Sequence, residues 1–182
     1  QLNWSPRTFI NHRQYIKLFF NYCVSHGFIK RNPVDKIKRP KVPQTLPRFL
    51  TSKQISSILI HLELCNWRYK SERHRNKTII YTLIFTGIRV NELINLKITD
   101  VNMDEKEITV QKGKGKKQRI IPIHPQLFPI LEYYFNYLSK RQKQSGWFFY
   151  NLRYFQKKMS TRSAQMLCEK LSKKSGVKFT PH

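Results

Sequence analysis

The sequence predicts an α+β fold that is mainly α-helical and carries one small antiparallel β-sheet. Most apolar residues recur at helical spacing. Only two short β-branched runs occur together, at 107–111 and 119–123, and a glycine- and lysine-rich turn separates them. Hydrophobic residues make up 40% of the 182 residues. That fraction is enough to fill a core and argues against a disordered chain.

The N-terminal part contains too few elements to fold alone. Ser5 followed by proline predicts the start of a long helix that Gly27 ends, and Asn32 before proline predicts a second, short helix. Three prolines within 39–47 predict a stiff linker. We therefore expect two domains, 1–44 and 45–182, the first being the end of a helical domain whose beginning is absent.

The second part predicts further helices around the hairpin. Thr51 and Gln54 form a capping box at the start of one helix, and Gly87 and Gly176 are placed to end two others. Trp147-Phe148-Phe149 suggests a short buried strand, although an exposed face for stacking on bases is the alternative. The expected helices are 51–62, 79–85, 89–96, 125–138 and 161–175.

Charge points to a polyanionic partner. Lys and Arg number 35 against 10 Asp and Glu, which gives a formal net charge of +25. A compact domain with this surplus repels itself, and nucleic acid phosphates would relieve the repulsion. A solvated basic surface, or a lysine-rich composition inherited from an AT-rich genome, is the alternative.

Several classes are disfavoured by what the sequence lacks. No run of 18 apolar residues occurs, the first residues do not look like a secretory signal, and Cys23, Cys65 and Cys168 have no paired spacing. We expect a cytoplasmic protein with no membrane segment, no metal and no small-molecule cofactor.

The stretch 86–96, T-G-I-R-V-N-E-L-I-N-L, with Asp100 soon after, is the strongest chemical signal. A glycine turn between two helices would put Arg89 at a helix N-terminus, where the helix dipole disfavours a cation. A bound phosphate would compensate, because the N-terminus and the guanidinium both donate hydrogen bonds to it. The alternative is a surface arginine paired with Glu92, one turn on.

Two weaker signals follow. The segment 112–119, K-G-K-G-K-K-Q-R, would form a basic hairpin tip suited to a DNA backbone, although most basic hairpins are merely solvated. It is not a P-loop, because G-x-x-x-x-G-K-[ST] is missing. The final Pro181-His182 means little by itself.

Together these motifs resemble the tyrosine recombinase (phage integrase) family, and its Xer-like members in particular. The order is T-G-x-R-x-x-E-L-x-x-L-x-x-x-D, then K-G-K-G-x-K-x-R-x-x-P, then a late P-H. The resemblance implies a catalytic domain preceded by part of a helical core-binding domain. It matches Arg89 to the first catalytic arginine, Lys114 to the hairpin lysine and His182 to the first residue of H-x-x-R. The nucleophilic tyrosine would lie beyond His182.

The resemblance implies a site-specific recombinase that cleaves and rejoins DNA strands through a 3′-phosphotyrosine intermediate. Its partner would be a double-stranded DNA site, bound by a homo-tetramer, in chromosome-dimer resolution, phage integration or the movement of a mobile element. Basic residues of both parts are expected to contact the DNA. These are Lys112, Lys116, Lys117, Arg119, Arg13, Lys17 and Arg75.

Other functions stay open on the residues alone. A DNA-binding module that cannot cleave, or a basic RNA-binding protein, would have the same charge. Asp100, Asn102 and Asp104 mimic the start of an EF-hand, but Glu105 and Gln111 occupy positions that need glycine and glutamate. His61 and Cys65 lie one helical turn apart without two further zinc ligands at sensible spacing. The ten acids offer no convincing carboxylate trio for a metal-dependent transposase.

Overall fold

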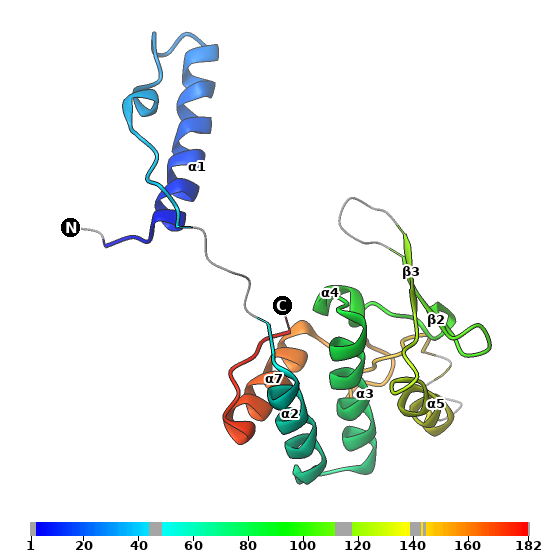
Figure 1. The fold of residues 1–182 in the computed structure, drawn as a ribbon. Coiled ribbons are helices and arrows are strands. Elements are labelled where there is room, and N and C mark those ends of the chain that lie inside the picture. The colour runs from blue at the N-terminus through cyan, green and yellow to red at the C-terminus, as the bar shows by residue number, and fades with distance from the viewer. Residues whose placement is uncertain (1–2, 44–48, 112–117, 139–142, 144, 182) are drawn as a thin grey trace. The chain divides into compact units, whose positions relative to one another are not determined.

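The computed structural model describes residues 3–43, 49–111, 118–138, 143 and 145–181 (Figure 1). The chain forms two compact units, which we call unit 1 (Gln1–Phe49) and unit 2 (Leu50–His182). The sequence placed its boundary at residue 44, at the start of a segment outside the described residues.

Unit 1 consists of helix α1 (Pro6–Ser25) and the short 3₁₀-helix η1 (Pro33–Lys36). The Ser5 hydroxyl accepts a hydrogen bond from the backbone N–H of Thr8, and the Asn32 side chain caps η1. Among the described residues of unit 1, Val34 is the one buried hydrophobic side chain. Large apolar side chains of α1 are exposed instead: Tyr15, Ile16, Leu18, Phe19 and Tyr22. The described part of unit 1 therefore encloses no core of its own.

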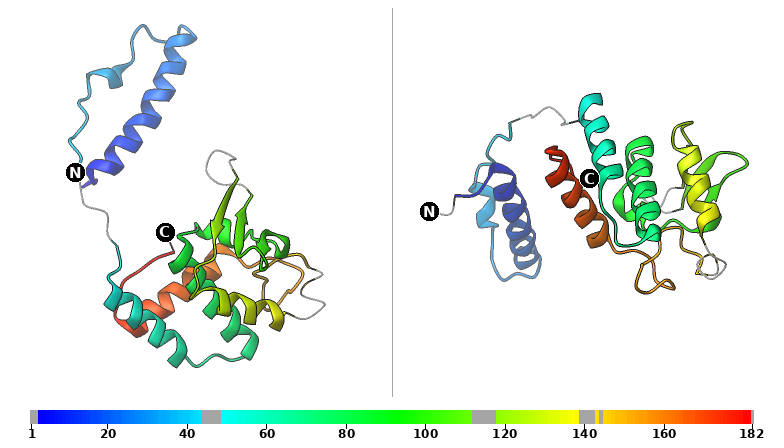
Figure 2. Two further views of the ribbon diagram at one scale, coloured as in Figure 1. Left: turned by 45° about the vertical axis from the view of Figure 1, so that its right-hand side comes forward. Right: turned by 90° about the horizontal axis from the view of Figure 1, so that it is seen from below.

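Unit 2 is built from helices with a small sheet beside them (Figures 1 and 2). Helix α2 packs on α7, and helix α3 packs on α5. The helical elements are α2 (Ser52–Leu64), α3 (Lys70–Thr86), α4 (Val90–Leu93), η2 (Ile98–Asp100), α5 (Phe128–Tyr137) and α7 (Thr161–Ser175).

The sheet has three antiparallel strands in the order β1-β2-β3. They are β1 (Val101–Asn102), β2 (Glu107–Val110) and β3 (Arg119–Pro122). Val110 of β2 pairs with Arg119 of β3, and Ile108 pairs with both Val101 and Ile121. The predicted hairpin is present, and the predicted α+β class is confirmed.

One hydrophobic core joins the helices and the sheet of unit 2. The side chains at its centre come from every layer, so the elements cannot shift independently without opening cavities. Fully buried members are Ile58, Leu62, Ile79, Leu93, Ile108, Leu127, Leu131, Tyr134, Phe148, Phe149 and Leu171. None of the helices in the described ranges is long and apolar enough to cross a membrane.

The structure differs from the sequence predictions in three elements. Helix α3 begins at Lys70, well before the apolar run at 79–85. Its first turns are polar and basic, so they carry no apolar periodicity from which a helix could be predicted. Helix α4 is a single turn, whereas 89–96 was expected to be helical. Phe148 and Phe149 are buried as predicted, but they lie between the isolated bridges Lys97↔Trp147 and Tyr150↔Lys158 and form no strand.

Candidate catalytic and DNA-binding site

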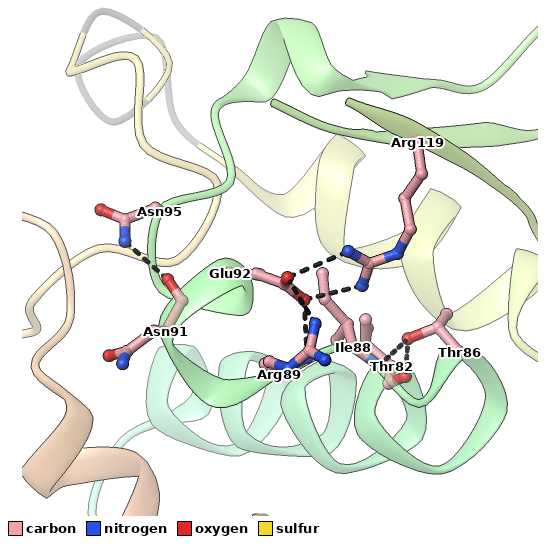
Figure 3. A network of polar contacts seen from close by, with 8 residues as sticks. All are labelled: Thr82, Thr86, Ile88, Arg89, Asn91, Glu92, Asn95 and Arg119. Atoms are coloured by element: carbon pink, nitrogen blue, oxygen red, sulfur yellow. Dashed lines mark hydrogen bonds and ion pairs between the residues drawn. The ribbon is translucent and has the colours of Figure 1, made fainter. Parts of the chain in front are cut away.

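The turn after α3 fixes the backbone that carries Arg89. Gly87 ends the helix at φ +60°, in the left-handed region, and its N–H donates to the carbonyl of Leu83. The Thr86 hydroxyl donates to the carbonyl of Thr82 at 2.6 Å and accepts the N–H of Ile88 at 3.2 Å (Figure 3). These bonds lock the direction in which the chain leaves α3.

Arg89 is the residue before the single turn of α4, and 59% of its side-chain surface is exposed. One terminal nitrogen, Nη1, lies 3.2 Å from Oε1 of Glu92. A helix of one turn has little dipole, so the unfavourable effect on a cation that the sequence predicted at this N-terminus is small. The guanidinium is held from one side by Glu92 and faces solvent on the other.

Glu92 is the buried centre of the polar network in Figure 3, with only 6% of its side chain exposed. Its Oε2 accepts the Arg89 backbone N–H at 2.9 Å and Arg119 Nη2 at 2.7 Å. Its Oε1 accepts Arg119 Nη1 at 2.9 Å. Hydrogen bonds from Arg119 are the main cause that lowers the pKa of this carboxyl from its ordinary 4.5 to about 2, against the opposing effect of burial.

Arg119 enters this network from the first position of β3. It grips both carboxylate oxygens of Glu92 in a bidentate pair, and the pair raises the pKa of the guanidinium further above its already high value. About 37% of its side chain is exposed. The sequence placed Arg119 among the DNA contacts, whereas both of its terminal nitrogens bond to protein.

A second side-chain bond holds the other strand of the hairpin. Gln111 follows β2 directly, and its Nε2 donates to Oδ1 of Asp100 at 2.8 Å. Asp100 is buried, and its Oδ2 accepts the N–H of Lys97 at 2.8 Å. The described residues on both sides of the lysine-rich tip are thus tied to carboxylates of the segment 89–100.

Five of the predicted site residues lie outside the described residues. These are Lys112, Lys114, Lys116, Lys117 and His182. The structure does describe the neighbouring residues 111, 118 and 181. Ser172 of α7 bonds to the backbone of Val177 and Phe179, and the segment after α7 runs to the side of unit 2 where α4 lies (Figure 2).

Two predicted DNA-contacting arginines are buried, and we remove them from that set. Arg75 donates to the carbonyl of Tyr150 at 3.1 Å and to Oδ1 of Asn76. Burial also lowers the pKa of its guanidinium. Arg13 donates to the carbonyls of Ile37 and Val34, both at 2.9 Å. These guanidinium groups satisfy buried backbone oxygens, so they are not displayed to a phosphate.

Lys17 is more accessible than the two buried arginines. Its ammonium pairs with Asp35 at the surface of unit 1. An exposed pair of this kind is weak and can be exchanged for a phosphate at little cost. Lys17 therefore stays a predicted DNA contact.

The metal alternatives find no support within the described ranges, where no group of three His, Cys, Asp or Glu residues could hold a metal ion. His61 Nδ1 lies 2.8 Å from the carbonyl of Ser57. The side chain of Asn102 accepts the N–H groups of Asp104 and Glu105, which makes the EF-hand-like stretch an ordinary turn.

Sequence reasoning missed the shared use of Glu92 by two arginines. The motif spacing gave the Arg89–Glu92 pair as an alternative, but Arg119 lies 27 residues further along the chain. The one available signal was that Arg119 stands at the base of the predicted hairpin, where an acidic residue such as Glu92 could pair with it. It could be used only once the strand register was known.

The match of residues 48–182 to the phage integrase family covers most of the chain, and the chain therefore belongs to that family. Within the family it is similar to Xer recombinases, which confirms the predicted resemblance. It is 36% identical over 149 residues to tyrosine recombinase XerA of Pyrococcus furiosus, covering 81% of this chain and 49% of that protein. It is 35% identical over 133 residues to a tyrosine recombinase of Thermosipho africanus, covering 71% and 44%.

A third relative matches along the whole chain. Tyrosine recombinase XerC of Chlamydia trachomatis serovar L2 is 29% identical over 184 residues, covering 100% of this chain and 57% of that protein. The chain thus spans about half the length of the curated relatives it matches.

Solved structures share the fold. XerH recombinase in a pre-cleavage complex with its difH substrate superposes with a TM-score of 0.75 at 20% identity, over 100% of this chain and 52% of that one. A lambda integrase dimer bound to a COC′ core site gives 0.70 at 18%, over 92% and 58%. A XerA recombinase gives 0.62 at 23%, over 99% and 66%.

Proposed function

We propose that this chain is part of a site-specific DNA recombinase that cleaves and rejoins strands through a 3′-phosphotyrosine intermediate. The observation that carries the proposal is Arg89, an exposed guanidinium whose backbone is fixed by the Thr86-Gly87 turn and by Glu92. Membership of the phage integrase family and a net charge of +25 support it.

Arg89 suits the stabilisation of a phosphoryl transition state. Charge builds on the nonbridging oxygens as the tyrosine oxygen attacks, and a fixed cation lowers the energy of that charge. A guanidinium stays protonated and can donate to two oxygens at once. The bond energy is kept in the phosphotyrosine, so rejoining needs no external energy source.

Lys114 and His182 complete the proposed chemistry. The leaving 5′-oxygen needs a proton, and a lysine can release one whereas an arginine effectively cannot. His182 would hydrogen-bond the same phosphate or move protons near neutral pH. Both roles rest on the family resemblance.

We propose no nucleophile among the nine tyrosines of this chain. Tyr134 and Tyr150 are buried, and burial raises the pKa of the Tyr134 hydroxyl. Tyr154 is exposed but precedes α7, whereas the family resemblance puts the nucleophile after His182.

The proposed partner is a double-stranded DNA site. Several solved structures of similar fold are DNA complexes, among them XerH with difH and the Tn1549 transposon integrase with circular intermediate DNA. Action as a homo-tetramer, on a mobile element or a chromosome, in the cytoplasm, belongs to the same proposal. It rests on the family resemblance.

The test uses the full-length parent protein and a duplex selected for binding from a random-sequence pool. With a nick placed near the cleavage position, we expect a protein–DNA adduct that survives denaturant and carries the DNA by its 3′-phosphate. An Arg89→Ala variant should bind the duplex and give no adduct. Stable binding by the parent protein without any adduct would overturn the proposal and favour a DNA-binding module that does not cleave.

A further inference from the structure

We propose that Arg119 is a positioning residue that acts through Glu92 to hold Arg89 ready for a phosphate. The inference rests on the proposed function, because it assigns Arg119 a role in strand cleavage. It differs from the expectation that Arg119 contacts DNA directly.

The first argument is the saturation of the Glu92 carboxylate. Each of its oxygens accepts one hydrogen bond from Arg89 and one from Arg119, at 2.7 to 3.2 Å. A carboxylate offers about four acceptor positions. Arg119 therefore decides how many bonds, and from which directions, Glu92 can offer to Arg89 (Figure 3).

The second argument is charge. Glu92 and Arg89 alone would form a neutral pair, in which a buried carboxylate draws the guanidinium onto itself. With Arg119 present, two positive groups share one negative group, and the cluster keeps a net charge of +1. Arg89 thus keeps an accessible face, with 59% of its side-chain surface exposed to solvent. Removal of Arg119 would let Glu92 compete with the substrate phosphate for Arg89.

The third argument is place. Arg119 is the first residue of β3 and pairs across the hairpin with Val110. Just after the opposite strand, Gln111 is tied to Asp100. The Arg119–Glu92 pair therefore also ties the start of β3 to the turn that carries Arg89.

Direct contact with DNA is the weaker interpretation. Nη1 and Nη2 of Arg119 each donate one hydrogen bond to Glu92, so the guanidinium is oriented by a largely buried carboxylate that already offsets its charge. Its remaining N–H donors would bind a phosphate more weakly than those of a free arginine. The two interpretations differ in what a lysine would do. A lysine keeps the charge for a phosphate but cannot hold both carboxylate oxygens.

The experiment measures duplex affinity and the single-turnover cleavage rate at saturating DNA for full-length variants. The variants are Arg119→Lys, Arg119→Gln, Glu92→Gln and the double variant, with Arg73→Gln as control. Arg73 pairs with Glu63 on the surface, near the far end of α3. The Arg73→Gln and Arg119→Gln changes remove the same charge.

We expect both Arg119 variants to cleave about 10- to 100-fold more slowly, by analogy with the loss of contacts that support metal ligands. Their affinity should stay within about threefold of Arg73→Gln, which should cleave normally. The double variant should be no slower than Glu92→Gln alone, because Arg119 acts only through Glu92. If Arg119→Gln fails to fold because the buried Glu92 carboxylate keeps only its bonds to Arg89, the double variant lacks that carboxylate charge and still decides the question.

Two results would overturn the inference. A lysine at position 119 that restores the full cleavage rate would indicate a phosphate contact. Multiplicative losses in the double variant would indicate independent roles. Failure of the unmodified protein to form an adduct would overturn the proposed function instead, so the two failures are distinguishable.

Discussion

At the scale of single residues, the site depends on one exposed cation and one buried anion. Arg89 and Glu92 are three positions apart, yet their exposed fractions are 59% and 6%. The difference follows from the turn of α4, which directs Glu92 toward β3 and leaves Arg89 at the surface. Burial and the bonds from Arg119 hold the Glu92 carboxylate in place. Arg89 is therefore positioned at the surface, where a ligand could reach its guanidinium.

Arg89→Lys tests whether the planar fork matters beyond its charge. We expect DNA affinity to stay within about threefold, since the charge is kept. The cleavage rate should fall by roughly 100-fold or more, about 3 kcal/mol of transition-state stabilisation. Single-turnover adduct formation measures the rate. An unchanged rate would remove the bidentate role, and Arg73→Lys serves as the control for an arginine outside the site.

Lys114→Arg tests the proposed acid. Affinity should be kept because both side chains are cationic, whereas cleavage should slow because the guanidinium does not release its proton at neutral pH. A substrate whose leaving oxygen is replaced by sulfur needs less protonation, so it should restore much of the rate. Equal rates for both proteins on the ordinary substrate would remove the acid role.

Glu92 should make folding stability depend on pH. Its folded pKa of about 2 lies below the ordinary 4.5, so its contribution is complete above pH 4.5 and is lost as pH falls through 2. This difference in pKa corresponds to a contribution of Glu92 to the free energy of unfolding of about 3 kcal/mol at pH 7 and about 1.4 kcal/mol at pH 3. Urea unfolding of the unmodified protein and Glu92→Gln should show this narrowing gap. A gap that does not change with pH would contradict the assigned cause.

At the scale of elements, local capping signals predicted several helix ends, whereas contacts between residues far apart in the sequence determined the site. Helix ends were predictable because capping by Ser5, Thr51 and the left-handed glycines acts within a few residues. The burial of Arg75 was not, because its acceptor on Tyr150 lies 75 residues away. The pairing of Arg119 with Glu92 was unpredictable for the same reason: the two residues are 27 positions apart and meet only through the register of β2 and β3. The sequence therefore placed Arg119 among the DNA contacts.

Gly87→Ala tests the turn between α3 and α4. At φ +60° an alanine is strained, although no atom lies within 4 Å of the added carbon. We expect a loss of about 1 kcal/mol in the free energy of unfolding. The cleavage rate should also fall, even where the variant is fully folded, because the strained turn displaces Arg89. Gly146→Ala, at φ +76° and equally open, should lose similar stability and keep its cleavage rate. Equal cleavage by both variants would contradict a positioning role for the turn.

At the scale of the whole molecule, 35 basic residues outnumber 10 acidic ones, and several of the described acids already have partners. Glu63, Glu92 and Asp35 are paired with basic side chains, and Asp100 is buried under hydrogen bonds. Most of the surplus charge is therefore available to phosphates. Binding should be dominated by counterion release and should depend strongly on salt.

Salt titration also separates duplex DNA binding from the RNA-binding alternative. For about six phosphate contacts, the affinity for a non-specific duplex should fall about 1000-fold between 50 and 200 mM salt. A single-stranded RNA of equal length should bind more weakly at each salt concentration and show a shallower slope, because its charge density is lower. Fluorescence anisotropy with both probes measures this. A steeper slope and tighter binding for the RNA would indicate that the basic surface is shaped for a different partner than a duplex.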